Sequence, residues 1–219
     1  MNAIKLLEKD HRDVKALFRK YERAGQGAHK EKQTLAQQII RALSIHAAIE
    51  EQFFYPAARA VDERLSDQVL EALEEHHVAK WTLNELDRMK PDDERFDAKM
   101  TVLMENIRHH IDEEERELFP KLQKRLAPTD LDELGRLLEG AKKASPTHSH
   151  PMAPDTPPGN VIAGPLAKLL DLGRDFARSF VNKARQRTAT AAKAAKKRVA
   201  AAKKAAKAKA KPAKRRRSA

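Results

Sequence analysis

Two eleven-residue segments carry the side chains of this chain that are best suited to bind a metal. The sequence HAAIEEQFFYP at residues 46–56 is followed sixty-four positions later by HIDEEERELFP at residues 110–120. Each begins with a histidine and has a glutamate four positions on, so an imidazole and a carboxylate share one helix face and can reach the same cation. Each ends on an aromatic residue and a proline, which cannot donate a helical hydrogen bond. We therefore expect both segments to form the last turns of their helices.

Apolar residues at helical spacing predict four long helices that would position these segments. The four stripes end near Gly25, at Pro56, near Met89 and at Pro120. Helices of this length with modest connections are typical of an all-α, antiparallel four-helix bundle. The stripe residues are Ile4, Leu7, His11, Val14, Phe18 and Tyr21; Leu35, Ile39, Leu43, His46, Glu50, Phe53 and Phe54; Val69, Leu73, His76, Leu83 and Leu86; and Met100, Leu103, Ile107, His110, Glu114 and Leu118.

One histidine interrupts the apolar stripe of each predicted helix, so folding would gather four imidazoles and two carboxylates in one interior region. An isolated His/Glu pair is commonly only a solvated pair on a helix surface. Buried carboxylates without partners are costly, and a pair of divalent cations would offset that cost. Mixed imidazole and carboxylate ligands in a bundle core favour iron or manganese over a single zinc ion. The six candidate ligands are His11, His46, Glu50, His76, His110 and Glu114.

Over residues 1 to about 125 the chain resembles the hemerythrin-like family, also called the HHE cation-binding domain. The motifs that carry the resemblance are Asp10-His11 with Phe18, His46-x-x-x-Glu50 with Phe54-Tyr55-Pro56, Glu75-His76, and His109-His110-x-x-x-Glu114 with Leu118-Phe119-Pro120. The resemblance implies a non-haem di-iron centre, with manganese as an alternative, and O2, peroxide or NO as a small ligand. The four histidines on the stripes would be terminal ligands and Glu50 and Glu114 would be bridges, with Glu115 a weaker candidate for the second bridge.

The sequence departs from the oxygen-carrying members of that family at one position. Those proteins have a second histidine four residues after the first on the third helix, whereas this chain has Lys80 four residues after His76. A lysine is cationic and would oppose cation binding, so the resemblance implies that one iron lacks a ligand. This favours sensing, peroxide or nitric oxide chemistry, or iron handling over reversible oxygen carriage.

The remaining histidines and aromatic residues are expected to have ordinary roles. His77 and His109 point about 100° away from their neighbours His76 and His110, so they are expected behind the ligands or at the surface. His29, His148 and His150 lie in predicted loops and are expected in solvent. The large apolar residues Trp81, Phe53, Phe54 and Leu83 are expected to be core.

Composition shifts along the chain predict five regions. Residues 1–126 would form the bundle and 127–144 an accessory helix, with Thr129 as its N-cap and Gly140 near its end. Residues 145–165 hold six prolines and are expected to be a linker. Residues 166–184 are expected to form an amphipathic helix that packs on the bundle or self-associates into a homo-oligomer. Residues 185–219 would be a Lys/Ala/Arg-rich tail.

The net charge of +12 is divided unevenly along the chain. Residues 183–219 contain sixteen Lys and Arg and no acidic residue, whereas the first 182 residues carry 28 basic and 32 acidic side chains. Such a tail, similar to those of linker histones, is expected to bind nucleic acid without sequence preference through counterion release. A merely solubilising tail and an anionic membrane surface are the alternatives.

Other function classes are excluded or weakened by what the sequence lacks. It has no cysteine, which excludes disulfides, iron–sulfur clusters and thiol catalysis. It has no hydrolase triad, P-loop or dinucleotide fingerprint, and no leader or membrane-spanning segment, so a cytoplasmic location is expected. The leading hypothesis is a di-iron protein associated with nucleic acid. The alternatives are a nucleoid-associated protein with a structural bundle and, less favoured, a ferritin-like iron store.

Overall fold

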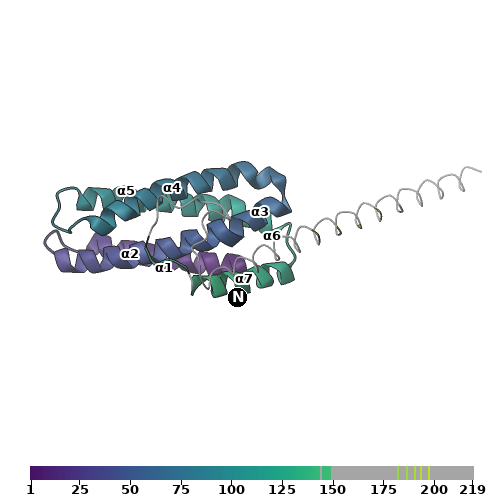
Figure 1. Ribbon diagram of the computed structural model, residues 1–219, viewed down its shortest axis with the longest axis horizontal. Coiled ribbons are helices and arrows are strands. Elements are labelled where there is room, and N and C mark those ends of the chain that lie inside the picture. Colours follow the sequence, from purple (N-terminus) through teal and green to yellow (C-terminus); the bar gives the residue numbers. More distant parts are fainter. Residues whose placement is uncertain are drawn as a thin grey trace, which may run out of the picture. The chain divides into compact units, whose positions relative to one another are not determined.

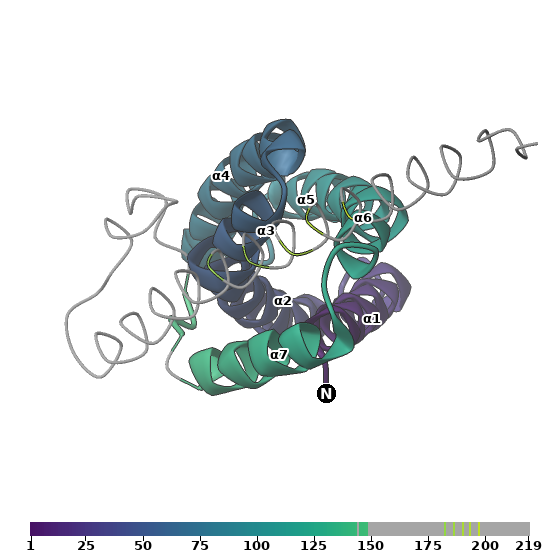
Figure 2. The same ribbon diagram turned by 90° about the vertical axis from the view of Figure 1, so that its right-hand side faces the viewer.

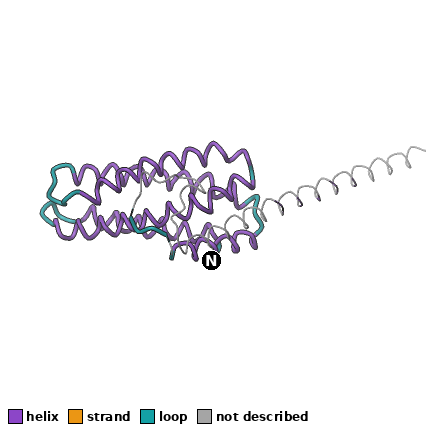
Figure 3. The backbone as a smooth tube through the Cα atoms, in the orientation of Figure 1, coloured by secondary structure: helices purple, strands orange, loops and turns teal. Residues whose placement is uncertain are grey.

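The computed structural model describes residues 1–143 and 145–148 and five separate later positions, residues 182, 186, 190, 193 and 197. Two compact units divide at residue 180. The described residues of the first unit are helical apart from their connections and contain no strand, which confirms the predicted all-α class (Figure 3). Most of the predicted linker (145–165), amphipathic helix (166–184) and basic tail (185–219) lies outside the described residues.

Four long helices form the bundle: α1 (Ala3–Arg23), α2 (His29–Ile49), α4 (Ser66–Arg88) and α5 (Phe96–Glu113). They lie side by side around a common axis (Figures 1 and 2). Short connections join α1 to α2 and α4 to α5, so each pair is an antiparallel hairpin. The predicted bundle is therefore confirmed.

The apolar core consists of two clusters separated by a polar layer. One cluster contains Leu7 and Ile49, and the other contains Val14 and Leu43. On α1, α2 and α4 the stripe histidine falls between residues of the two clusters, as His11 does between Leu7 and Val14, and on α5 His110 lies near the end of one cluster. The predicted stripes are buried along their whole length, and they position the four histidines at one level of the bundle.

Both helices that carry a His/Glu pair continue past their proline, so the prediction that they end there is wrong. A π-helical turn, η1 (Glu50–Phe54), follows α2 and leads into α3 (Tyr55–Val61); η3 (Glu114–Leu118) follows α5 and leads into α6 (Phe119–Gln123). Each wide turn is closed by a backbone hydrogen bond between residues five positions apart, from Tyr55 N–H to the Glu50 carbonyl and from Phe119 N–H to the Glu114 carbonyl. The proline then falls in the first turn of the next α-helical segment, where a missing N–H is tolerated.

A further helix, α7 (Pro128–Lys142), covers one side of the bundle end and packs on α1 and α2 (Figure 2). Its N-cap is Ala127 and Pro128 occupies its first position, so Thr129 is not the cap that was predicted. The helix also continues beyond Gly140. Gly135 touches the start of α1 so closely that an added Cβ would lie 2.2 Å from the Met1 carbonyl oxygen, so only glycine fits at this crossing.

A short 3₁₀ turn, η2 (Glu63–Leu65), connects α3 to α4. Phe53, Phe54 and Leu83 are buried as predicted, but Trp81 is 44% exposed, so its assignment to the core is wrong. Its indole N–H donates to His77 Nε2 on the outer face of α4. None of the described helices is long and apolar enough to span a membrane.

Candidate metal centre

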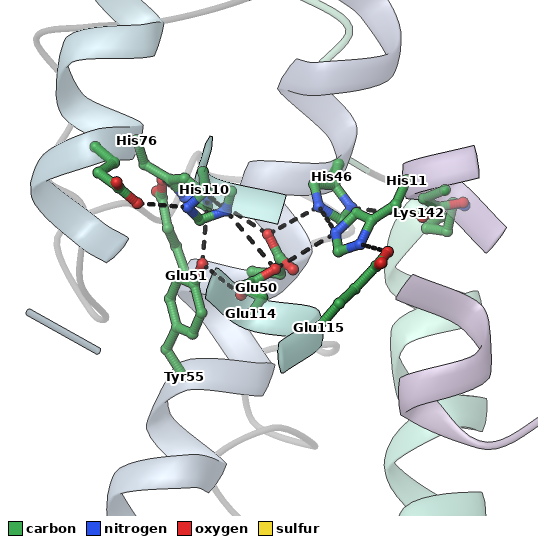
Figure 4. A network of polar contacts seen from close by, with 12 residues as sticks. His11, His46, Glu50, Glu51, Tyr55, His76, His110, Glu114, Glu115 and Lys142 are labelled. Carbon is green, nitrogen blue, oxygen red and sulfur yellow. Dashed lines mark hydrogen bonds and ion pairs between the residues drawn. The ribbon is translucent and has the colours of Figure 1, made fainter. Parts of the chain in front are cut away.

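The polar layer of the bundle contains all six predicted ligands. They come from four helices and the two π turns that follow α2 and α5, and their side chains converge on one point (Figure 4). None is more than 5% exposed. The six residues are His11 on α1, His46 on α2, Glu50 on η1, His76 on α4, His110 on α5 and Glu114 on η3.

The ligand atoms form two groups, and the first lies between α1 and α2. His11 Nε2 is 3.1 Å from His46 Nε2, and His46 Nε2 is 3.1 Å from Glu50 Oε2. Glu114 Oε2 lies 3.4 Å from His11 Nε2. Together these atoms could hold one ion.

The second group lies between α4 and α5. His76 Nε2 is 3.2 Å from His110 Nε2, and Glu50 Oε2 is 3.5 Å from His76 Nε2. Glu114 Oε2 is 3.7 Å from His110 Nε2. Because Glu50 and Glu114 approach histidines of both groups, they lie where bridging carboxylates would connect two ions.

The facing imidazoles of the second group fit a cation better than a hydrogen bond. His76 Nδ1 is 3.0 Å from Glu51 Oε1 and His110 Nδ1 is 2.7 Å from Glu75 Oε2, so each Nδ1 holds the proton and donates it to a carboxylate. Both Nε2 atoms then present lone pairs to each other at 3.2 Å. Two nitrogens bound to one ion at about 2.1 Å and at right angles would lie about 3 Å apart. The spacing therefore suits two ligands of a single ion.

Buried oxygen atoms without partners support the same interpretation. Both carboxylate oxygens of Glu50 and the Oε2 atom of Glu114 have no hydrogen-bond partner among the described residues. Buried polar atoms in native proteins are nearly always satisfied, so each such atom requires an explanation. Cations between these carboxylates would satisfy all three oxygens.

Burial and neighbouring charges set the protonation of the centre. Burial, strengthened by the Glu114 carboxylate, raises the pKa of Glu50 well above its ordinary value. Burial alone would also raise the pKa of Glu114, but the His110 and His11 imidazoles lower it to about 2. Burial and the adjacent His110 lower the pKa of His76 well below its usual range. A neutral imidazole and an ionised carboxylate are the forms that bind metals.

Four carboxylates lie behind the histidines, near their Nδ1 atoms, and the sequence analysis did not predict this group. Besides Glu51 and Glu75, Glu115 Oε1 is 2.8 Å from His11 Nδ1, and Asp10 Oδ2 is 3.7 Å from His46 Nδ1. Carboxylates behind ligating histidines fix the tautomer and raise the basicity of the ligand. The sequence signal was an acidic residue next to four of the six candidate ligands, immediately before His11 and His76 and immediately after Glu50 and Glu114.

Three further side chains make polar contacts with carboxylates of the centre. Tyr55, which is 1% exposed, donates from its hydroxyl to Glu114 Oε1 at 3.0 Å. Lys80 donates to Glu51 Oε2 at 2.9 Å. The sequence suggested that its charge would oppose a cation, but the structure pairs this charge with a carboxylate. Lys142 of α7 contacts Asp10 Oδ1 at 2.5 Å.

The side chains of Glu114 and Glu115 face different parts of the centre. Glu114 faces the two histidine groups, whereas Glu115 contacts the far nitrogen of His11 and its side chain is 34% exposed. Glu115 therefore lies behind a ligand and not between the two groups.

The other histidines lie away from the centre. His109 is exposed and pairs with Glu113 at 3.3 Å, and His77 is half-buried on the outer face of α4. His29 and His148 are exposed, as predicted, and His150 lies outside the described residues.

Comparisons with known proteins agree with this arrangement. The family model described as Hemerythrin HHE cation binding domain matches residues 2–122. An uncharacterized hemerythrin-like protein of Schizosaccharomyces pombe is 34% identical over 140 residues, covering 64% of this chain and 69% of the relative. The crystal structure of a Hemerythrin HHE cation binding domain-containing protein from Mycobacterium kansasii is 26% identical with a TM-score of 0.56, covering 66% of this chain and 86% of that chain.

Proposed function

The chain belongs to the hemerythrin HHE cation-binding family, and we propose that it holds two iron ions and reacts with O2, peroxide or NO. His11 and His46 would bind one ion, His76 and His110 the other, and Glu50 and Glu114 would bridge them. The observation that carries this proposal is the pair of facing Nε2 atoms in each group, 3.1 Å and 3.2 Å apart. Iron is favoured over manganese because histidines outnumber carboxylates in the set.

The iron pair would supply the electrons for oxygen or nitric oxide chemistry, and the protein around it restricts what can enter. A cavity of about 20 Å³ is lined by all four histidines and by apolar residues such as Val14, Leu43 and Leu83. This volume suits a ligand about the size of one water molecule. The Tyr55 hydroxyl lies within the centre, 3.3 Å from His76 Nε2, and would hold the Glu114 carboxylate in place by donating its hydrogen to Oε1.

Metal analysis of the purified full chain, together with its ultraviolet–visible spectrum, tests this proposal. After anaerobic loading with Fe²⁺ and exposure to O2 or peroxide, we expect two iron ions per chain and absorption bands typical of oxo-bridged iron. His46→Ala and His110→Ala should each lose iron and these bands, and His29→Ala, which changes an exposed histidine, should retain both. Unchanged iron content in the first two variants would contradict the proposal.

We infer a second function from the charge of residues 183–219, namely non-specific association with nucleic acid. Of this region the structure describes Gln186, Thr190, Lys193 and Lys197, which are helical and exposed. Deletion of residues 183–219 should abolish salt-sensitive DNA binding and leave the iron content unchanged. If the deletion also removed all reactivity toward O2 or peroxide, the bundle would have a mainly structural role.

A further inference from the structure

Two surface cavities on the α4–α5 face lead to the second histidine group. The larger, of about 530 Å³, is lined by side chains that include Glu74, His109, His76 and His110. The smaller, of about 90 Å³, lies toward η3 and is lined by residues that include His110 and Glu114. Both cavities share Glu71, Glu75 and His110, so they meet at the outer side of the same ligand.

Several carboxylates line both cavities, beside apolar side chains such as Val78 and Ile107 in the larger one. Neither contains a lysine or arginine among the described residues that line it. Glu117, at the rim of the smaller cavity, is paired with Lys121 at 3.1 Å, so its charge is partly compensated. The lining carboxylates are Glu71, Glu74, Glu75, Glu113, Glu114 and Glu117.

The acidic lining extends from exposed to fully buried residues. Glu71 and Glu74 are exposed, Glu75 and Glu113 are half-buried, and Glu114 at the inner end is 2% exposed. The buried Oε2 atom of Glu114 has no hydrogen-bond partner among the described residues. A cation that reached this end would therefore meet an oxygen that accepts no hydrogen bond from the described residues.

A second, more exposed group of candidate metal ligands lies beside this path. Oxygen and nitrogen atoms of Glu75, His109 and Glu113 lie within 4.8 Å of one another and could hold one ion. His109 and Glu113 repeat the four-residue spacing of His110 and Glu114, one position earlier and on the outer face of α5. Glu75 also accepts from His110 Nδ1 at 2.7 Å, so this outer group and the buried centre share a contact.

We propose that this acidic face is the entry route for divalent cations and that Glu75, His109 and Glu113 hold a cation briefly before it enters the centre. This inference rests on the proposed function, because it requires a centre that takes up two ions. Carboxylates lining a cavity raise the local concentration of cations and accelerate their association. A cation entering here reaches His76 and His110 before it reaches His11 and His46.

Loading of the metal-free full chain with Co²⁺, followed by stopped-flow absorbance, tests the route. The route variant is Glu71→Gln/His109→Ala/Glu113→Gln, which leaves every proposed ligand of the centre and Glu75 in place. The control variant Glu31→Gln/His29→Ala/Glu94→Gln removes the same number of charges and imidazoles at exposed positions elsewhere on the bundle. We expect the route variant to load at least about ten times more slowly than the control at low salt, because electrostatic steering is typically worth 10- to 1000-fold.

The final amount of Co²⁺ separates the two proposals. The route variant should still bind two ions in the centre, and its rate deficit should shrink at high ionic strength because salt screens surface charges. Equal loading rates in the route and control variants, with two ions bound in both, would overturn the entry route alone. Failure of the unmodified chain to bind two ions would overturn the proposed function and the route together.

Discussion

The two halves of the candidate metal centre use similar donors in different surroundings. On the α1–α2 side the ring of Phe119 stacks parallel to that of His11 at 5.7 Å, and α7 covers the neighbouring surface and holds Asp10 through Lys142. On the α4–α5 side the ring of His110 borders two acidic cavities. We therefore expect the donor atoms to define which cation binds and the surroundings to define how quickly it exchanges.

Replacement of the residue that both halves share should have the largest effect. Glu50→Met should lower cation binding in both groups and remove the thermal stabilisation that metal provides, since that stabilisation follows site occupancy. The metal-free variant should instead be more stable, by about 1–4 kcal/mol, because an unpaired buried carboxylate is replaced by an apolar side chain of similar volume. Calorimetry with and without metal measures both effects. A metal-free variant less stable than the unmodified protein would contradict the interpretation of Glu50 as an unsatisfied group.

Exchange rates should distinguish the halves directly. His46→Ala should leave a cation only in the open α4–α5 group, and His110→Ala should leave one only in the covered α1–α2 group. A chelator should remove the first cation faster, because the cavities beside His110 open the α4–α5 group to solvent whereas α7 covers the α1–α2 side. Absorbance of bound Co²⁺ after addition of the chelator gives both rates. Equal rates would mean that the surroundings do not control exchange.

Loosening α7 should weaken only the covered half. An alanine Cβ at position 135 would clash with the backbone of Met1 and Ala3, and such overpacking typically costs about 1–3 kcal/mol. Gly135→Ala should therefore lower the free energy of unfolding by that amount and accelerate cation loss from the α1–α2 group. Gly25→Ala is the matched control, because an added Cβ there meets nothing within 4 Å. Denaturant unfolding measures the stability of both variants.

The smallest effect is expected for the partly exposed ion pair that joins α7 to the centre. Lys142→Met should lower the free energy of unfolding by about 1 kcal/mol, because the lysine end of the pair is 32% exposed while the Asp10 carboxylate that loses its partner is buried. Asp10 would no longer be held by α7, so the cation affinity of the α1–α2 group should change while that of the α4–α5 group stays constant. Competitive metal titration measures both affinities, with Lys143→Met as the control. An equal change in both groups would indicate a general electrostatic effect.

The sequence was sufficient to predict the bundle and to place the six buried polar residues in one layer. A histidine on an apolar stripe must face the core, so His11, His46, His76 and His110 could be recognised without knowledge of their neighbours. The outer carboxylates could not be assigned in the same way, because Asp10 and Glu75 contact histidines of adjacent helices. Their roles depend on how the helices pack, which periodicity alone does not specify.

The errors made from the sequence have local physical causes. Proline was expected to end each helix, but a π turn before Pro56 and Pro120 lets the helix continue. Trp81 was assigned to the core from its apolar character alone, although it lies four residues after His77, on the outer face of α4. The contact between Gly135 and the start of α1 joins residues more than 130 positions apart and has no local sequence signal.

The two π turns limit how this domain can change over evolution. Each begins at a bridging candidate, Glu50 or Glu114, and contains one residue more than a regular α-helical turn requires. Deletion of a single residue there would convert the turn to regular α-helix and rotate Tyr55, or Phe119 in the second copy, by about 100° relative to the ligands. Lineages descended from this chain should therefore retain Glu50, Glu114 and the length of segments 50–54 and 114–118, and accumulate substitutions at the other positions of these segments.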